Sequence, residues 1–87
     1  MGFEVLEVQP TPNPNANKYV LDRPIVEQPL SYFNADAAKD DPLAMKLFAI
    51  KGVTTLLFLG DFLTVNKTPD AKWASITPKV KAILTEA

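Results

Sequence analysis

The 87-residue chain contains no cysteine and no histidine. Disulfides, thiolate nucleophiles, imidazole bases and Cys/His zinc sites are therefore excluded within this sequence. It also shows no nucleophile–base pair and no glycine-rich phosphate loop, so nothing in it supports catalysis. We predict a non-enzymatic protein that holds no cofactor and no metal.

A concentration of charge of one sign is also missing. Nine basic residues are scattered among ten acidic ones, for a net charge of -1. A nucleic-acid binder needs a concentrated basic patch, so we expect no nucleic-acid partner. No apolar run approaches 18 residues, so we expect no membrane span. The segment Met1–Glu7 carries acids where a signal peptide needs bases, and we expect a cytoplasmic protein.

What is present is the composition of a small soluble domain. Hydrophobic residues make up 47% and charged residues 22% of the chain. That balance is ordinary for a globular fold. We expect residues 1–87 to form a single domain with one modest core.

Prolines separate the first predicted strands. Phe3–Val8 is rich in β-formers and predicts strand one. Three prolines within Gln9–Ala16 lack a backbone N–H and fix φ, which predicts a stiff loop. Lys18–Asp22 predicts strand two, and Leu30–Asn34 is a candidate for a short further strand.

The middle of the chain predicts a helix followed by a hairpin. Asp41 can cap a helix that has Pro42 at its first position, and Gly52 ends it by tolerating a left-handed conformation. The apolar run Val53–Leu59 is too short for a buried helix and predicts a central strand. Gly60 and Asp61 then suit a two-residue turn, with an antiparallel return over residues 62–66.

A last helix is expected from Thr68–Asp70 onward, with one apolar stripe. Pro78 lies inside that stripe, which favours one kinked helix over a second helix starting at Thr77. The order of strands, helix, hairpin and helix predicts an α+β fold. We expect a mostly antiparallel sheet of about four strands, with two helices packed on one face.

Four segments, in order, resemble a known family. They are Thr11–Leu21, Asp41–Val53, Asp61–Lys67 and Asp70–Trp73 followed by Pro78. Together they are similar to the N-terminal domain of the Nfu/NifU-like iron–sulfur cluster scaffold proteins. The resemblance implies an α+β fold and a link to iron–sulfur cluster assembly. In the full-length family a separate domain with a Cys-x-x-Cys motif holds the cluster.

The residues present do not match that chemistry. Clusters are typically held by cysteine thiolates, sometimes with histidine, and this sequence has neither. The resemblance therefore implies an accessory role, in which the chain binds an iron–sulfur scaffold or client protein. The alternative is a stand-alone structural or protein-binding domain outside that pathway. The sequence does not define the oligomeric state.

Two surfaces are candidates for partner binding. The first is the loop before strand two, where a rigid backbone presents Asn13, Asn15 and Lys18 at low entropic cost; the alternative is ordinary turn chemistry. The second is the helix-free face of the sheet. Because Val53–Leu59 is apolar on both faces, either Leu56 and Phe58 or the alternates Leu57 and Leu59 lack cover, unless the N-terminal strand or residues 24–39 bury them.

Two further groups have simpler interpretations. Asp36, Asp40 and Asp41 precede a helix, where capping explains them better than a weak metal site or an acid/base pair. Phe48 and Trp73 fit helical stripes, which favours core packing over a role as exposed anchors.

Overall fold

Five strands and two α-helices make up the fold. The computed structural model describes residues 2–87. In chain order the elements are β1 (Val5–Pro10), β2 (Ala16–Leu21), β3 (Leu30–Tyr32), the 3₁₀ turn η1 (Asp36–Ala38), α1 (Pro42–Phe48), β4 (Val53–Leu59), β5 (Phe62–Lys67) and α2 (Trp73–Glu86). The predicted α+β class is confirmed.

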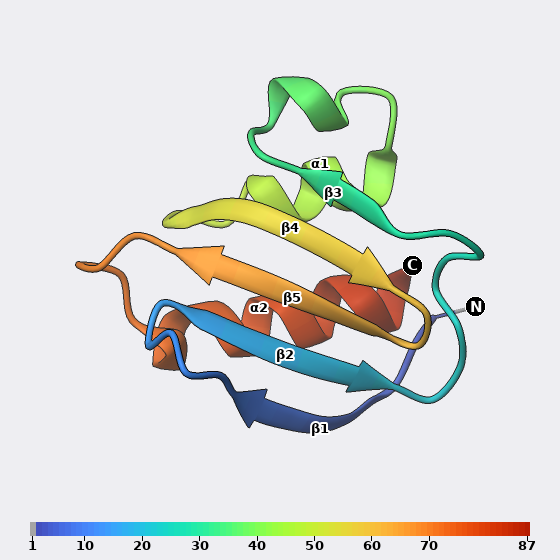
Figure 1. Ribbon diagram of the computed structural model, residues 1–87, viewed down its shortest axis with the longest axis horizontal. Coiled ribbons are helices and arrows are strands. Elements are labelled where there is room, and N and C mark those ends of the chain that lie inside the picture. Colours follow the sequence, from blue (N-terminus) through green and yellow to red (C-terminus); the bar gives the residue numbers. More distant parts are fainter. Residues whose placement is uncertain (1) are drawn as a thin grey trace.

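The strands form one sheet in the order β1-β2-β5-β4-β3, and all neighbouring pairs are antiparallel. The expected count of about four strands is one too few, because β3 pairs with the outer side of β4 over three residues. The prediction that β4 is the central strand is only partly correct, because β4 is an interior strand but lies between β5 and β3, next to the edge. The middle of the sheet is β5, whose partners are β2 and β4 (Figure 1).

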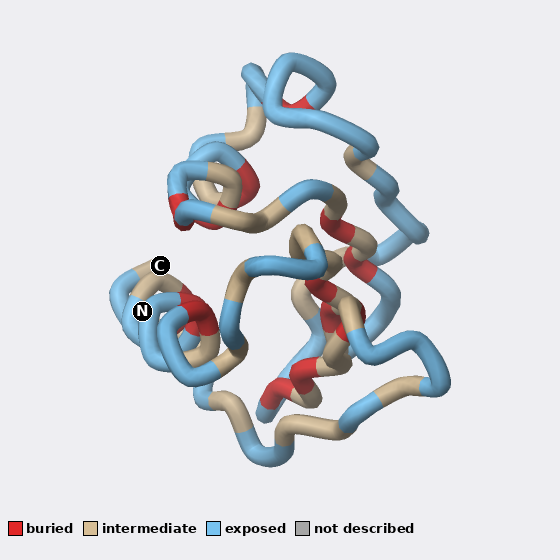
Figure 2. The backbone as a smooth tube through the Cα atoms, turned by 90° about the vertical axis from the view of Figure 1, so that its left-hand side faces the viewer, coloured by how far each residue is buried: buried red, intermediate tan, exposed pale blue. Residues whose placement is uncertain are grey.

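Both α-helices lie on one face of the sheet, behind the strands in Figure 1 and to their left in Figure 2. The core lies between these two layers. Alternate strand residues meet one stripe from each helix there; the largest buried side chains are Tyr19, Leu21, Leu47, Leu56, Phe58, Leu63, Val65, Ile76, Val80 and Leu84. Within residues 2–87, no helix covers the opposite face of the sheet.

Local chemistry sets the boundaries of α1. The Asp41 carboxylate accepts a hydrogen bond from the Ala44 N–H at 3.1 Å, and Pro42 follows the cap, as predicted. The helix ends at Phe48 with Ala49 as its C-cap, earlier than the end predicted at Gly52, which adopts φ +99° in the turn that follows. An ideal Cβ at Gly52 would lie 2.6 Å from the Cβ of Ala71, so the turn into β4 also needs glycine for space.

The last helix begins later than expected, at Trp73, because residues 68–72 form a turn instead. It continues through Pro78 to Glu86, so the alternative of a second helix starting at Thr77 is wrong. Pro78 follows Thr77, whose hydroxyl lies 2.9 Å from the buried Tyr19 hydroxyl. Gly60 has φ +58° in the predicted two-residue turn between β4 and β5. Among residues 2–87, no helix is both long and apolar enough to cross a membrane.

The first strand is also shifted from its prediction, toward Val5–Pro10, and its pairing with β2 is irregular between Val5 and Glu7. The skipped residue, Leu6, is 60% exposed. A bulge of this kind blunts an edge strand against unwanted pairing. The 3₁₀ turn η1 had no counterpart in the sequence prediction.

Candidate functional site

The predicted partner-binding loop lies between β1 and β2 and is held by its own side chains. The Thr11 hydroxyl accepts from the Asn13 N–H at 3.1 Å and lies 2.9 Å from the carbonyl oxygens of Asn13 and Ala16. The Asn13 side-chain oxygen accepts from the Asn15 N–H at 2.9 Å. Such Asx and hydroxyl turns are the ordinary use of these residues in loops.

The same loop is also hydrogen-bonded to the end of β5 and to the start of α2. Lys67 Nζ donates to the Asn15 side-chain oxygen at 3.0 Å, and Trp73 Nε1 donates to the Pro14 carbonyl at 3.1 Å. Lys67 Nζ also lies 5.7 Å from the centre of the Trp73 ring, within cation–π range. The side-chain oxygens of Asn13 and Asn15 therefore hold the loop. Turn chemistry accounts for the Asn13 side-chain oxygen and the contact with Lys67 for that of Asn15, and the role of both residues in partner binding stays a prediction.

Lys18 lies elsewhere, on the helix-free face of the sheet. Its Nζ is 4.0 Å from the centre of the Phe62 ring, a cation–π geometry. The residues on this face alternate along each strand with the buried residues of the core face. We call this surface the open sheet face; it consists of Lys18 and Val20 on β2, Phe62 and Thr64 on β5, and Leu57 and Leu59 on β4.

The prediction that Leu56 and Phe58 bind a partner is contradicted by their burial. They are 0% and 2% exposed and pack in the core beneath the helices. Phe58 also meets the Tyr32 ring edge-on, with centroids 6.0 Å apart. The alternates Leu57 and Leu59 take the open face, and Leu59 is 37% exposed. The predicted apolar surface is therefore present, but Leu57 and Leu59 form it, because the side chains of β4 alternate in the opposite sense to the one predicted.

Among the three aspartates before α1, Asp41 has two hydrogen-bond partners within residues 2–87: the Ala44 N–H that it caps and the Tyr32 hydroxyl. The Tyr32 hydroxyl donates to its carboxylate at 3.0 Å, which ties β3 to α1. Burial, followed by this contact with Asp41, raises the pKa of Tyr32. Within residues 2–87, no group of three or more Asp, Glu, His or Cys side chains is placed to hold a metal ion. Capping is the role that the geometry supports.

Trp73 and Phe48 pack against the core and are partly exposed. The Trp73 ring meets Tyr19 edge-on, with centroids 6.5 Å apart, and so links α2 to β2. Desolvation raises the pKa of Tyr19, and its hydrogen bond with Thr77 only partly offsets that effect. These aromatic contacts fix the position of α2 on the sheet.

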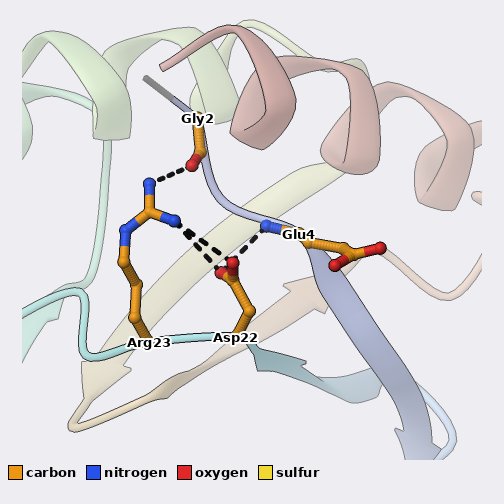
Figure 3. Close-up of polar contacts among 4 residues, drawn as sticks. All are labelled: Gly2, Glu4, Asp22 and Arg23. Atoms are coloured by element: carbon orange, nitrogen blue, oxygen red, sulfur yellow. Dashed lines mark hydrogen bonds and ion pairs between the residues drawn. The ribbon is translucent and has the colours of Figure 1, made fainter.

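A polar cluster at the N-terminal end was missed in the sequence. The Arg23 guanidinium pairs with Asp22 at 3.2 Å and donates to the Gly2 carbonyl (Figure 3). It also lies 4.5 Å from the centre of the Phe3 ring. Asp22 in turn accepts from the Glu4 N–H at 3.1 Å. The adjacent Asp22-Arg23 pair was the only available signal, because the partners lie some 20 residues earlier in the chain.

This cluster pins the N-terminal segment to the last helix. The Phe3 N–H donates to the Leu84 carbonyl at 2.7 Å, and a Cβ at Gly2 would overlap the Thr85 carbonyl. The Asp22–Arg23 ion pair is substantially exposed and contributes about 0–1 kcal/mol. These contacts hold the N-terminal segment against the end of β2 and the last turn of α2.

Comparison with known proteins gives one consistent result. The family model described as "Scaffold protein Nfu/NifU N terminal" matches residues 6–87. The chain is 33% identical over 82 residues to NifU-like protein 5, mitochondrial, of Arabidopsis thaliana, covering 93% of this chain and 30% of that protein. It is 34% identical over 86 residues to the human NFU1 iron-sulfur cluster scaffold homolog, mitochondrial, covering 97% of this chain and 34% of that protein.

A third relative has a different name. Conserved virulence factor C of Staphylococcus aureus is 31% identical over 85 residues, covering 98% of this chain and 23% of that protein. The chain thus spans about a third or less of these curated relatives.

Solved structures agree with the fold. The solution structure of a NifU-like protein from Saccharomyces cerevisiae superposes with a TM-score of 0.82 at 27% identity, over 98% of this chain and 77% of that one. A crystal structure of a protein from Staphylococcus aureus superposes with a TM-score of 0.77 at 26% identity, over 92% of this chain and 96% of that one.

Proposed function

The chain belongs to the family of Nfu/NifU scaffold N-terminal domains, and from that premise we propose that it is a non-enzymatic protein-interaction module of iron–sulfur cluster assembly. Relatives that contain the same domain are named as iron–sulfur cluster scaffolds and NifU-like proteins. The proposed partner is a scaffold protein that carries the cluster, or a client that receives it.

The chemistry of the chain favours docking over cluster ligation. An iron–sulfur cluster needs thiolate or imidazole ligands, and the sequence contains neither cysteine nor histidine. The residues present therefore do not fit a cluster held by this chain itself. In this proposal the cluster is cargo that the partner carries.

The observation that supports docking is the open sheet face. Leu57, Leu59, Val20 and Phe62 form an apolar strip on three adjacent strands, and Lys18 lies over the Phe62 ring. Apolar surface with a charged rim is typical of protein interfaces. Since sheet hydrogen bonds hold the strip in place, a partner meets a preformed surface and little backbone is ordered on binding.

The experiment is a titration of the isotope-labelled chain with a Cys-x-x-Cys scaffold domain, in its apo and cluster-loaded forms, followed by chemical shifts. We expect the largest shifts at Leu57, Leu59, Phe62 and Lys18. Leu59→Ser should weaken binding, whereas Met45→Ser on α1 should not. Leu59 and Met45 are a matched pair because their exposed fractions are 37% and 39%. Absence of shifts with both forms of the scaffold would refute the proposal.

A second candidate is a protein-binding domain outside iron–sulfur assembly. The similarity to Conserved virulence factor C, whose name refers to no cluster, favours it. The same titration separates the two functions, because this alternative predicts no response to either form of the scaffold while the fold stays intact.

A further inference from the structure

The helix side of the molecule carries a groove between α1 and α2, away from the open sheet face. One hollow of about 400 Å³ lies at the start of α2, and a second of about 290 Å³ lies midway between the helices. Both are lined by Ile50 and Lys79, so they adjoin. We call this surface the interhelical groove; α1 and α2 are the two coils on the left of Figure 2.

The groove has an apolar floor. Ala49 and Ile50, which follow α1, face Ala82 and Ile83 from α2. Small side chains at Ala49 and Ala82 leave the space open, whereas larger ones would close it. The floor therefore accepts apolar side chains from an occupant, whose burial would supply most of the binding energy.

The rim of the groove is basic. It carries four exposed lysines: Lys46, Lys51, Lys72 and Lys79. Within residues 2–87, none of the four makes an ion pair or a side-chain hydrogen bond. Lysines free of internal partners keep their charges available to an incoming carboxylate, and their methylene stems extend the apolar surface.

One acidic residue shares this rim. The pKa of Asp70 is held below its ordinary value by a hydrogen bond with Thr68 and, to a smaller extent, by the charges of Lys51 and Lys67. Asp70 is therefore ionised and offsets part of the positive charge at one end. The hollow midway along the groove is lined by Lys46 and Lys79 and by no carboxylate of residues 2–87. The residues that line the two hollows include four lysines and one aspartate, so their charge is positive although the whole chain carries -1. Acidic residues lie beyond Lys46, where a neighbouring hollow is lined by Asp41 and Glu86.

We propose that the interhelical groove binds an acidic amphipathic segment of a protein partner, with apolar side chains on the floor and carboxylates against the lysine rim. A phosphate backbone fits less well, because the groove offers no arginine and no aromatic ring for stacking. The seven-residue α1 is roughly 10 Å long, which matches about two turns of a helical occupant. The inference goes beyond the proposed docking function, because it concerns the opposite face of the molecule.

The test uses a fluorescein-labelled synthetic peptide of about twelve residues with leucines on one helical face and glutamates on the other. We expect binding by fluorescence anisotropy that weakens with added salt. A second peptide with every glutamate replaced by glutamine should bind at least tenfold more weakly. Equal binding of the two peptides, or no binding of the acidic one at millimolar protein, would overturn the proposal.

Charge reversal locates the site. The double variant Lys46→Glu/Lys79→Glu should bind the acidic peptide at least tenfold more weakly. The matched control, Lys39→Glu/Lys81→Glu, makes the same change of net charge at exposed lysines that do not line the groove, and should change affinity less than twofold. Equal losses would show a general charge effect and refute the assignment. Circular dichroism of each variant excludes unfolding as the cause.

Two further arms separate the alternatives. Tighter binding of a short single-stranded oligonucleotide than of the acidic peptide, lost in the same charge-reversed variant, would overturn the choice of a protein partner. If the peptide binds while the Cys-x-x-Cys scaffold causes no chemical shift, the proposed function fails and the groove inference stands. If the scaffold binds and the peptide does not, the groove inference alone fails.

Discussion

Gly52 is a position outside the core where a single added methyl group should be strongly destabilising. The residue joins α1 to β4, and two independent constraints act on it. Its φ of +99° lies in a region that residues with a Cβ rarely adopt, and its Cβ would lie 2.6 Å from the Cβ of Ala71. The change Gly52→Ala therefore introduces both backbone strain and overlap.

The two contributions can be given magnitudes. A left-handed backbone costs a residue with a Cβ roughly 1–2 kcal/mol, and forcing a methyl into a packed site costs about 1–3 kcal/mol. Together they lower the free energy of unfolding by roughly 2–5 kcal/mol. A domain of this size has a total stability of about 4–13 kcal/mol, so the variant should be severely weakened.

Gly60 offers the matched control. It also has a positive φ, +58°, but a Cβ there would meet nothing within 4 Å in the part of the chain that the structure describes. Gly60→Ala should therefore cost only about 1–2 kcal/mol, from the backbone alone. The difference between the two glycines measures the overlap with Ala71.

The assay is equilibrium unfolding in urea at low temperature, followed by circular dichroism. It is applied to Gly52→Ala, Gly60→Ala, Ala71→Gly and the double variant Gly52→Ala/Ala71→Gly. Removing the Ala71 methyl should recover about 1–3 kcal/mol of the Gly52→Ala loss, as the interaction energy of a double-mutant cycle. If Gly52→Ala costs no more than Gly60→Ala, or the cycle shows no interaction, the steric explanation is wrong.

Three other changes should each give a distinct result. Asp41→Ala removes the α1 cap and the acceptor for the Tyr32 hydroxyl, and should cost about 1–3 kcal/mol in urea unfolding, while Asp41→Asn should recover part of the loss. Leu56→Ala should cost about 2–5 kcal/mol and Leu57→Ala well under half as much, because only Leu56 is fully buried; equal losses would contradict the observed strand phase. Because its folded pKa is raised above 10.0, Tyr19 contributes stability below that pH and loses it as pH rises through the folded value, so Tyr19→Phe should flatten the alkaline loss of stability.

Much of the fold follows from local chemistry. Asp41 before Pro42, the glycine turn before β4 and the Gly60-Asp61 turn each act over a few residues, so their positions were predictable. The start of α2 was not. Thr68, Pro69 and Asp70 are typical of a helix start, but Gly52 accepts a hydrogen bond from the Thr68 N–H and holds that segment as a turn.

The phase of β4 shows the corresponding limit for the site. Leu56, Leu57, Phe58 and Leu59 are all apolar, so no alternation marks the buried side. The phase is set by register with β5, where Leu56 pairs with Val65 and Leu57 with Thr64. The Thr64–Val65 alternation on the neighbouring strand was therefore the signal that could have corrected the prediction.

The interhelical groove could not be predicted at all from spacing along the chain. Its lysines come from α1, from the turn after it and from α2, and single lysines on exposed helix positions are common. Only the packing of the two helices brings Lys46 and Lys79 together.

The strand order also determines how the molecule must assemble. β1 with β2 and β4 with β5 are each joined by a short connection, so each pair can form within microseconds as a local hairpin. The seam between β2 and β5 instead joins Val20 to Phe62, across β3, α1 and half of the chain. Closing that loop loses chain entropy before any contact compensates for it. We expect the β2–β5 seam, and not either hairpin, to limit the folding rate, so substitutions along it should slow folding more than they speed unfolding.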